Sequence, residues 1–218
     1  MKALAIVAVL TSTASAAPTA NDVLASVQKF YTATKHLTVT FHQEVTHKAF
    51  GKVETSKGHA WILKPADFRF DYDQDIKGKT QTVKTFTFDG TTGSYVDRIN
   101  KKITKTAATS GVMPAAVSFL TGGNGLAKQF DATIDASKTY DDKDTVIALT
   151  PKQPSAEYAK LVFVVAANGH VRKSIVIASN GDSNAFEFFA PDDKTDVPAS
   201  LFVVDPKSVD GYAVETVK

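Results

Sequence analysis

The sequence contains no cysteine, which excludes a disulfide framework and any metal site built on thiolates. It also carries little net charge, because 25 lysines and arginines oppose 23 aspartates and glutamates. No basic cluster is interleaved with aromatic residues, so we expect no nucleic-acid partner. A chain of 218 residues with 43% hydrophobic composition can bury a core without cross-links. Composition therefore predicts a globular domain held together by packing.

Long apolar runs are absent apart from residues 3–10, and this run is too short to span a bilayer as a helix. Lys2 precedes it and the small residues 14–16 follow it, which is the order of a secretory signal peptide. We therefore expect residues 1–17 to be removed and residues 18–218 to form a single domain in the periplasm. Without a cysteine near the cleavage point, the mature chain has no site for lipid attachment.

The motifs of catalysis and of metal binding are also missing. His42 and His47 have opposite parity on a predicted strand, and no His-Glu-x-x-His pattern occurs. Residues 122–125 are glycine-rich but lack the lysine of a phosphate-binding loop, and there is no Gly-x-Ser-x-Gly elbow. The acidic pair Asp71 and Asp73 is expected on a solvated strand face. We therefore predict a protein that is not an enzyme and that uses no cofactor or metal.

Periodicity divides the chain into helical and extended parts. An amphipathic helix is predicted over residues 22–34, capped by Asn21-Asp22. From Leu37 onward the apolar period is two, and short strands recur about every ten residues with hairpin turns such as Asn168-Gly169. Short helical turns are predicted where residues 107–130 interrupt the strands, beginning at Pro114. This pattern predicts an α+β domain that is antiparallel throughout.

Aromatic residues are abundant, with 14 phenylalanines. Residues 67–73 alternate strictly, so that three aromatic rings share one strand face and Arg69 lies on the other. Pro65 separates this strand from the apolar run 60–63. Such rings can fill the core of a β-sandwich or line a hollow sheet that binds a ligand, and periodicity alone does not distinguish the two.

A resemblance to a known family favours the hollow sheet over the filled core. The segment Gly58-x5-Lys64-Pro65-x2-Phe68-Arg69-Phe70-x-Tyr72 resembles the Gly…(Lys/Arg)-Arg-Pro…Phe-Arg-Trp-x-Tyr segment of the periplasmic outer-membrane lipoprotein carrier family, LolA. Five further pieces are similar to the family and follow in its order: Leu37-x3-Phe41-x-Gln43, Asp89-Gly90…Asp97, Pro114…Phe130, Leu149–Lys152 and Val197…Val209. The absence of a lipidation cysteine favours the soluble carrier over the related outer-membrane receptor.

The resemblance implies a strongly curved, incomplete antiparallel β-barrel closed by a lid of short helices. It implies a monomeric carrier that takes the acyl chains of lipoproteins from an inner-membrane ABC transporter of the LolCDE type. The cargo would pass to an outer-membrane acceptor of the LolB type. Two alternatives stay open: a carrier of free lipid or glycolipid on the same fold, and a non-transport β-sandwich binding module.

The resemblance and strand parity together name the candidate site residues. Lys64 aligns with a family position, often arginine, whose side chain bonds lid carbonyls, and Arg69 aligns with the arginine of Phe-Arg-Trp. We expect these two residues to form the lid latch, although a lysine lacks the planar fork of arginine. Phe119 and Leu120 are the expected underside of the lid. The expected wall of the acyl-chain cavity consists of Phe68, Phe70, Tyr72, Phe86, Phe88 and Tyr95, joined by Trp61 or Ile62, whose side chains point to opposite faces of the strand.

Overall fold

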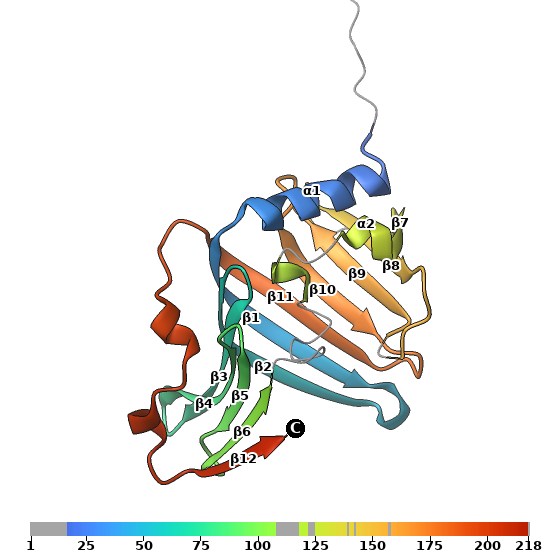
Figure 1. Ribbon diagram of the computed structural model, residues 1–218. Coiled ribbons are helices and arrows are strands. Elements are labelled where there is room, and N and C mark those ends of the chain that lie inside the picture. Colours follow the sequence, from blue (N-terminus) through green and yellow to red (C-terminus); the bar gives the residue numbers. More distant parts are fainter. Residues whose placement is uncertain are drawn as a thin grey trace, which may run out of the picture.

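One strongly bent, 12-stranded sheet forms the body of the protein in the computed structural model (Figure 1). Its strands follow the order β12-β6-β5-β4-β3-β2-β1-β11-β10-β9-β8-β7, so β12 and β7 form the two edges and the barrel is not closed. This confirms the predicted open barrel and excludes the β-sandwich, since all the described strands belong to one sheet. The structure describes residues 17–107, 118–121, 125–138, 140–141, 143–156 and 158–217.

The secondary-structure elements have the following bounds. The strands are β1 (His36–His47), β2 (Lys52–Leu63), β3 (Asp67–Ile76), β4 (Lys79–Phe88), β5 (Thr92–Asp97), β6 (Lys102–Ala107), β7 (Phe130–Ile134), β8 (Thr145–Pro151), β9 (Lys160–Val165), β10 (Val171–Ile177), β11 (Ser183–Asp192) and β12 (Ala213–Val217). The α-helices are α1 (Ala20–Ala33) and α2 (Leu126–Gln129). Four 3-10 turns complete the list: η1 (Lys48–Phe50), η2 (Ser118–Thr121), η3 (Ala199–Phe202) and η4 (Pro206–Val209).

The sheet consists of two antiparallel meanders joined through β1 and β11. Strands β1 to β6 pair in sequence order, as do β7 to β11, and the pairing of β11 with β1 unites the two sets. The prediction of antiparallel pairing throughout is wrong at one place, because β12 pairs with β6 in parallel. After β11 the chain crosses the outer face of the sheet through η3 and η4 and joins β6 at its N-terminal end (Figure 1). Parallel pairing follows from that entry point.

Helix α1 is present as predicted but begins earlier. Thr19 is its N-cap: the Thr19 hydroxyl accepts from the backbone nitrogen of Asp22 at 3.2 Å, and the Asp22 carboxylate accepts from the Thr19 nitrogen at 2.9 Å. This capping box replaces the predicted Asn21-Asp22 cap, because Asp22 sits three residues after the cap. The helix buries one stripe, including Leu24 and Val27, against the sheet. No helix among the described residues has the length and apolarity needed to cross a membrane.

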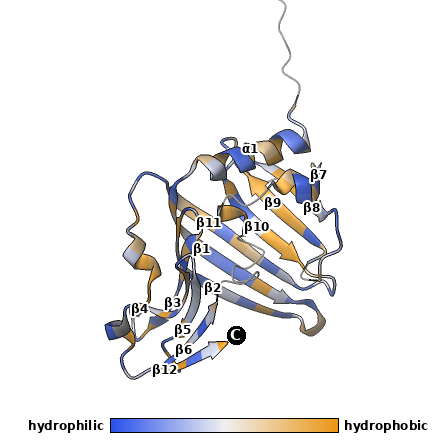
Figure 2. Ribbon diagram, viewed as in Figure 1, coloured by the Kyte–Doolittle hydropathy of each residue, from blue (hydrophilic) through white to orange (hydrophobic). Residues whose placement is uncertain are grey.

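Strand alternation gives the sheet an apolar concave face. Leu37, Val39 and Phe41 of β1 are buried, while the intervening side chains face outward. The hydrophobic strands β8 and β9 lie beneath α1 (Figure 2). One set of their side chains, which includes Ile147 and Phe163, joins the core with α1, and the other set, which includes Val146 and Val162, forms a separate buried cluster. Two sequence predictions lie outside the described residues: the signal peptide, apart from residue 17, and the helix start at Pro114.

Candidate functional site

A continuous aromatic floor covers the concave face of β2, β3 and β4. The register sets Ile62 opposite Phe68 and Phe68 opposite Phe88, and it sets Phe70 opposite Phe86 in the next row. The rings of Phe68 and Phe88 stack with centroids 5.6 Å apart, and the rings of Phe68 and Phe70 meet edge to face at 6.3 Å. These five predicted wall residues therefore come together on one face, as their alternation in sequence predicts.

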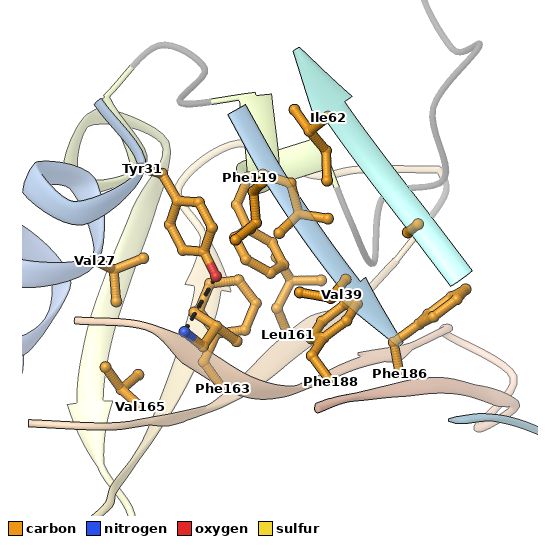
Figure 3. Close-up of a cluster of buried hydrophobic side chains, with 14 of the residues drawn as sticks. Val27, Tyr31, Val39, Ile62, Phe119, Leu161, Phe163, Val165, Phe186 and Phe188 are labelled. Atoms are coloured by element: carbon orange, nitrogen blue, oxygen red, sulfur yellow. Dashed lines mark hydrogen bonds between the residues drawn. The ribbon is translucent and has the colours of Figure 1, made fainter. Parts of the chain in front are cut away.

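The predicted lid residues fill the part of this concave face beneath α1. Phe119 and Leu120 belong to η2 and are only 4% and 2% exposed. The ring of Phe119 lies 4.7 Å from that of Phe163 on β9 and 5.1 Å from that of Tyr31 on α1 (Figure 3). Among the described residues, the interior at this end is therefore packed with the protein's own side chains.

Beyond this packed cluster the concave face opens into a groove of about 550 Å³. Three predicted wall residues, Tyr72, Phe86 and Tyr95, line it, whereas Phe68 and Phe70 are buried in the packed cluster. Burial raises the pKa of Tyr72 to about 12, so its hydroxyl is neutral at ordinary pH. The groove thus offers aromatic surface together with both neutral and charged polar groups. Its remaining lining comes from Gln43, Val45, Glu54, Thr55, Ser56, Asp73, Gln74, Val83, Lys84 and Ile99.

Gly58 allows two strands and two rings to meet at the floor. A Cβ atom at this position would lie 1.8 Å from the carbonyl oxygen of Asp71 and 3.0 Å from the ring of Phe41. Because glycine has no Cβ atom, the rings of Phe41 and Tyr72 can approach edge to face, with their centroids 5.2 Å apart. The glycine at the start of the motif is therefore required by close packing between β2 and β3.

Lys64 connects the corner between β2 and β3 to the lid side of the molecule. Its ammonium group donates to the carbonyl oxygens of Tyr31 and, at 3.0 Å, Thr32, both in the last turn of α1. A cation at a helix C-terminus satisfies carbonyls that have no partner within the helix and complements the helix dipole. Burial lowers the pKa of Lys64. Its described acceptors thus belong to α1, where a latch on the short helices was expected.

Of the two candidates on β2, Ile62 belongs to the cavity wall and Trp61 does not. The side chain of Trp61 lies on the outer face of β2, opposite to Ile62, because consecutive residues of a strand point to opposite sides. There its ring stacks with His59 at a centroid distance of 5.8 Å, and the guanidinium of Arg69 lies 6.0 Å from the ring centroid. The apolar run 60–63 did not reveal which of its large side chains faced inward.

Arg69 likewise lies on the outer face and holds the C-terminal segment, not the lid. It donates to both oxygens of Asp71, at 2.9 and 2.8 Å, and to the carbonyl of Leu201 in η3 at 3.0 Å. Asp71 is 8% exposed and also accepts from Thr85, so the expected solvated acidic strand face is wrong here. The reason is that η3 covers this part of the outer face, a long-range contact that local alternation does not encode.

Two buried polar groups beneath α1 were not identified from the sequence. The Tyr31 hydroxyl accepts from the backbone nitrogen of Val171 at 3.2 Å, and burial raises the pKa of Tyr31. His170 is 5% exposed next to the rings of Phe30 and Tyr31, and burial lowers its pKa to about 4. The neighbouring Asn168-Gly169 turn was recognisable, but its position under α1 was not. Within the described ranges, no three histidine or acidic side chains form a group that could hold a metal ion.

Comparison with known proteins identifies relatives at the level of family and fold. The family model described as "Outer membrane lipoprotein carrier protein LolA" matches residues 32–205. No curated protein matches the chain. A structure of an uncharacterised conserved protein from Thermus thermophilus shares 9% identity with a TM-score of 0.56, covering 91% of this chain and 99% of the other. A LolA superfamily protein from Nitrosomonas europaea, with 9% identity, has a TM-score of 0.45 and covers 86% and 99%.

Proposed function

The chain belongs to the family of LolA outer membrane lipoprotein carrier proteins, and from this premise we propose that it carries acylated lipoproteins through the periplasm. The aromatic floor of β2 to β4 would bind the acyl chains. The observation that carries the proposal is the continuity of this floor, which runs from the packed cluster under η2 into the open groove at Tyr72, Phe86 and Tyr95. A chain entering the groove would meet aromatic rings that continue into the floor, while the polar and charged side chains of the groove, among them Glu54, Asp73 and Lys84, would lie beside it.

Loading requires the lid side chains to leave this surface. An acyl chain of about 15 methylene groups gains on the order of 12 kcal/mol when it is buried, at about 0.8 kcal/mol per group. Exposing Phe119 and Leu120 costs about 1.5–3 kcal/mol each. One chain therefore outweighs the two side chains that occupy its place, and the lid cost weakens binding enough to support later release. Phe119 and Leu120 would thus fill the binding surface in the closed protein and leave it when an acyl chain binds.

Lys64 would restrain the lid side of the molecule during this exchange. Its two hydrogen bonds to α1 hold the end of the helix next to the corner of β2 and β3. We propose that this contact serves as the latch, whereas Arg69 braces the outer face through Leu201. The role needs no cofactor, metal or catalytic group.

The membership of the family supports a route for the cargo. We propose that residues 1–17 direct export and are removed, and that residues 18–218 act as a monomeric domain. An inner-membrane ABC transporter of the LolCDE type would supply the cargo, and an outer-membrane acceptor of the LolB type would receive it.

Native mass spectrometry of the exported protein tests the proposal. The protein is co-produced with a triacylated lipoprotein and, in parallel, with the same polypeptide carrying serine at its lipidation cysteine. We expect a one-to-one complex with the acylated polypeptide only. Phe86→Ser should reduce this complex, while the matched change Phe189→Ser, at a side chain 46% exposed, should leave it intact. Bound free lipid without polypeptide would favour the free-lipid alternative, and an empty protein in both preparations would contradict carriage.

A further inference from the structure

Every second turn of the first meander, β1 to β6, is rich in lysine. Because successive hairpin turns of an antiparallel sheet lie at opposite ends, these turns lie at the same end. One end carries the basic turns, which we define as residues 47–52, 76–79 and 98–102. They contain Lys48, Lys52, Lys77, Lys79, Lys101 and Lys102. The opposite end has Asp67, Asp89, Asp192, Asp193 and Asp196 together with Lys35, Lys64 and Lys194. A formal net charge of only +2 conceals this polarity.

Four of the six lysines of the basic turns form no ion pair with a described carboxylate. Lys52 pairs with Glu54, and Lys102 pairs with Glu215. The carboxylates that the structure describes form no ion pair with the other four, which are all exposed: Lys48, Lys77, Lys79 and Lys101. Asp182 lies close by, but it accepts from the backbone nitrogen of Lys48, at 2.8 Å, and not from its ammonium group. The basic turns therefore present uncompensated positive charge.

The same turns expose large apolar side chains. Phe50 is 86% exposed in η1, at the tip of the long hairpin of β1 and β2, and Ile99 is 60% exposed in the turn between β5 and β6. Gly51, beside Phe50, has a φ of 60°, and a Cβ atom added there would meet nothing within 4 Å. Each of these two side chains thus projects singly from a turn that also carries an unpaired lysine. Ile99 also lines the groove, so the basic turns border its mouth.

We propose that the three basic turns dock on an anionic lipid bilayer, with Phe50 and Ile99 entering the interface and the lysines contacting headgroups. Basic side chains beside apolar ones are the combination that binds proteins to anionic membrane surfaces. The exposed apolar side chains lie on separate hairpins: Phe50 and the nearby Val53 on that of β1 and β2, and Ile99 on that of β5 and β6. A protein partner would need a separate pocket for each tip, whereas a fluid bilayer accommodates separate tips without preformed pockets. Docking would turn the mouth of the groove toward the membrane, and it depends on neither the cargo nor the proposed carrier function.

Co-sedimentation with vesicles tests the charge component. The empty exported protein, with its N-terminus verified by mass, is mixed with vesicles of phosphatidylcholine alone or with one quarter phosphatidylglycerol. We expect binding to the anionic vesicles only, decreasing as salt shortens the Debye length below about 10 Å. Combining Lys77→Gln, Lys79→Gln and Lys101→Gln should weaken binding about 100-fold, since each lysine contributes roughly five-fold. The matched control combines Lys29→Gln, Lys128→Gln and Lys194→Gln, which change the net charge equally at exposed sites elsewhere, and should change binding less than about two-fold.

Labelling tests the apolar component, because the chain has no cysteine of its own. An environment-sensitive dye attached through Phe50→Cys should shift to shorter wavelength on anionic vesicles, while the same dye attached through Phe189→Cys should not. Protein that stays in solution with anionic vesicles at low salt would overturn the proposal. So would an equal loss of binding in the two lysine triples, or an unshifted dye at position 50. Binding to an immobilised acidic protein without vesicle binding would assign the basic turns to a protein partner instead.

Discussion

Replacing Phe119 by alanine should affect the stability of the closed, empty protein more than that of the loaded protein. In the closed structure this ring is 4% exposed and lies against Phe163 and Tyr31, at centroid distances of 4.7 and 5.1 Å. Truncating a buried phenylalanine costs about 3–5 kcal/mol. If the ring leaves the core when an acyl chain enters, the closed state alone bears this cost. The variant should then be less stable when empty and yet bind the acyl chain more tightly.

The magnitude follows from linkage between lid opening and binding. With a cost of about 3 kcal/mol borne only by the closed state, the affinity for an acyl chain should rise by up to roughly 100-fold. The same loss should lower the melting temperature of the empty protein by about 6–12 °C, at about 2–4 °C per kcal/mol for a domain of this size. Fluorescence titration with a labelled fatty acyl probe measures the first effect, and calorimetry measures the second.

Phe70→Ala provides the matched control. Phe70 is 2% exposed and packs against Phe41 and Phe186, but it belongs to the floor, which stays in place in both states. This variant should lose similar stability without any gain in affinity, since truncation affects the empty and the loaded protein alike. The reasoning is refuted if Phe119→Ala loses affinity together with stability in the same manner as Phe70→Ala. That result would make Phe119 a permanent part of the binding surface.

Four further changes test local features of the structure. Lys64→Met should destabilise the protein by about 1–3 kcal/mol and speed amide exchange at the end of α1, because two carbonyl oxygens lose a charged donor. Calorimetry measures the first effect and hydrogen exchange the second. The control Lys57→Met, at an exposed ion pair, should have little effect. Thr19→Ala should cost about 1 kcal/mol in a denaturant titration, because the capping box is lost; an unchanged midpoint would contradict the cap. The pKa of His170 is lowered to about 4 in the folded protein, so the unfolded state binds a proton at this histidine first as the pH falls below about 6.5. The free energy of unfolding should therefore fall by about 3 kcal/mol between pH 6.5 and pH 4. His170→Asn should flatten this part of the pH profile. Gly58→Ala should prevent normal folding, because the new Cβ would meet a backbone oxygen at 1.8 Å; a melting curve like that of the parent would refute this packing.

Much of the concave face was predictable from alternation. Phe68 and Phe70 share a face in the sequence pattern and in the structure, because a strand directs every second side chain to the same side. The fate of that face was not predictable: Phe70 is sealed in the packed cluster, while Tyr72, two residues on, lines the groove. The difference depends on how far the lid elements reach across the sheet. The alternation of side chains along a strand does not report which other elements pack against each face.

On the outer face of the sheet, alternation likewise did not predict which side chains are buried. Arg69 and Asp71 read as surface residues because they alternate with aromatic rings, yet η3 covers them and Asp71 is 8% exposed. The parallel pairing of β12 with β6 has the same origin, since the chain reaches that edge only after crossing the outer face. Contacts between residues 69 and 201 are set by the path of the whole chain.

By itself, the sequence determined the helix stripe, the strands, which side chains of a strand share a face and the family to which the chain is related. These properties depend on neighbours within a few residues, where backbone geometry dictates direction. The tertiary structure alone decided which faces are filled, which are covered from outside and where a groove stays open. It also placed the lysines of three separate turns at the same end of their strands, because the antiparallel meander returns every second turn to that end.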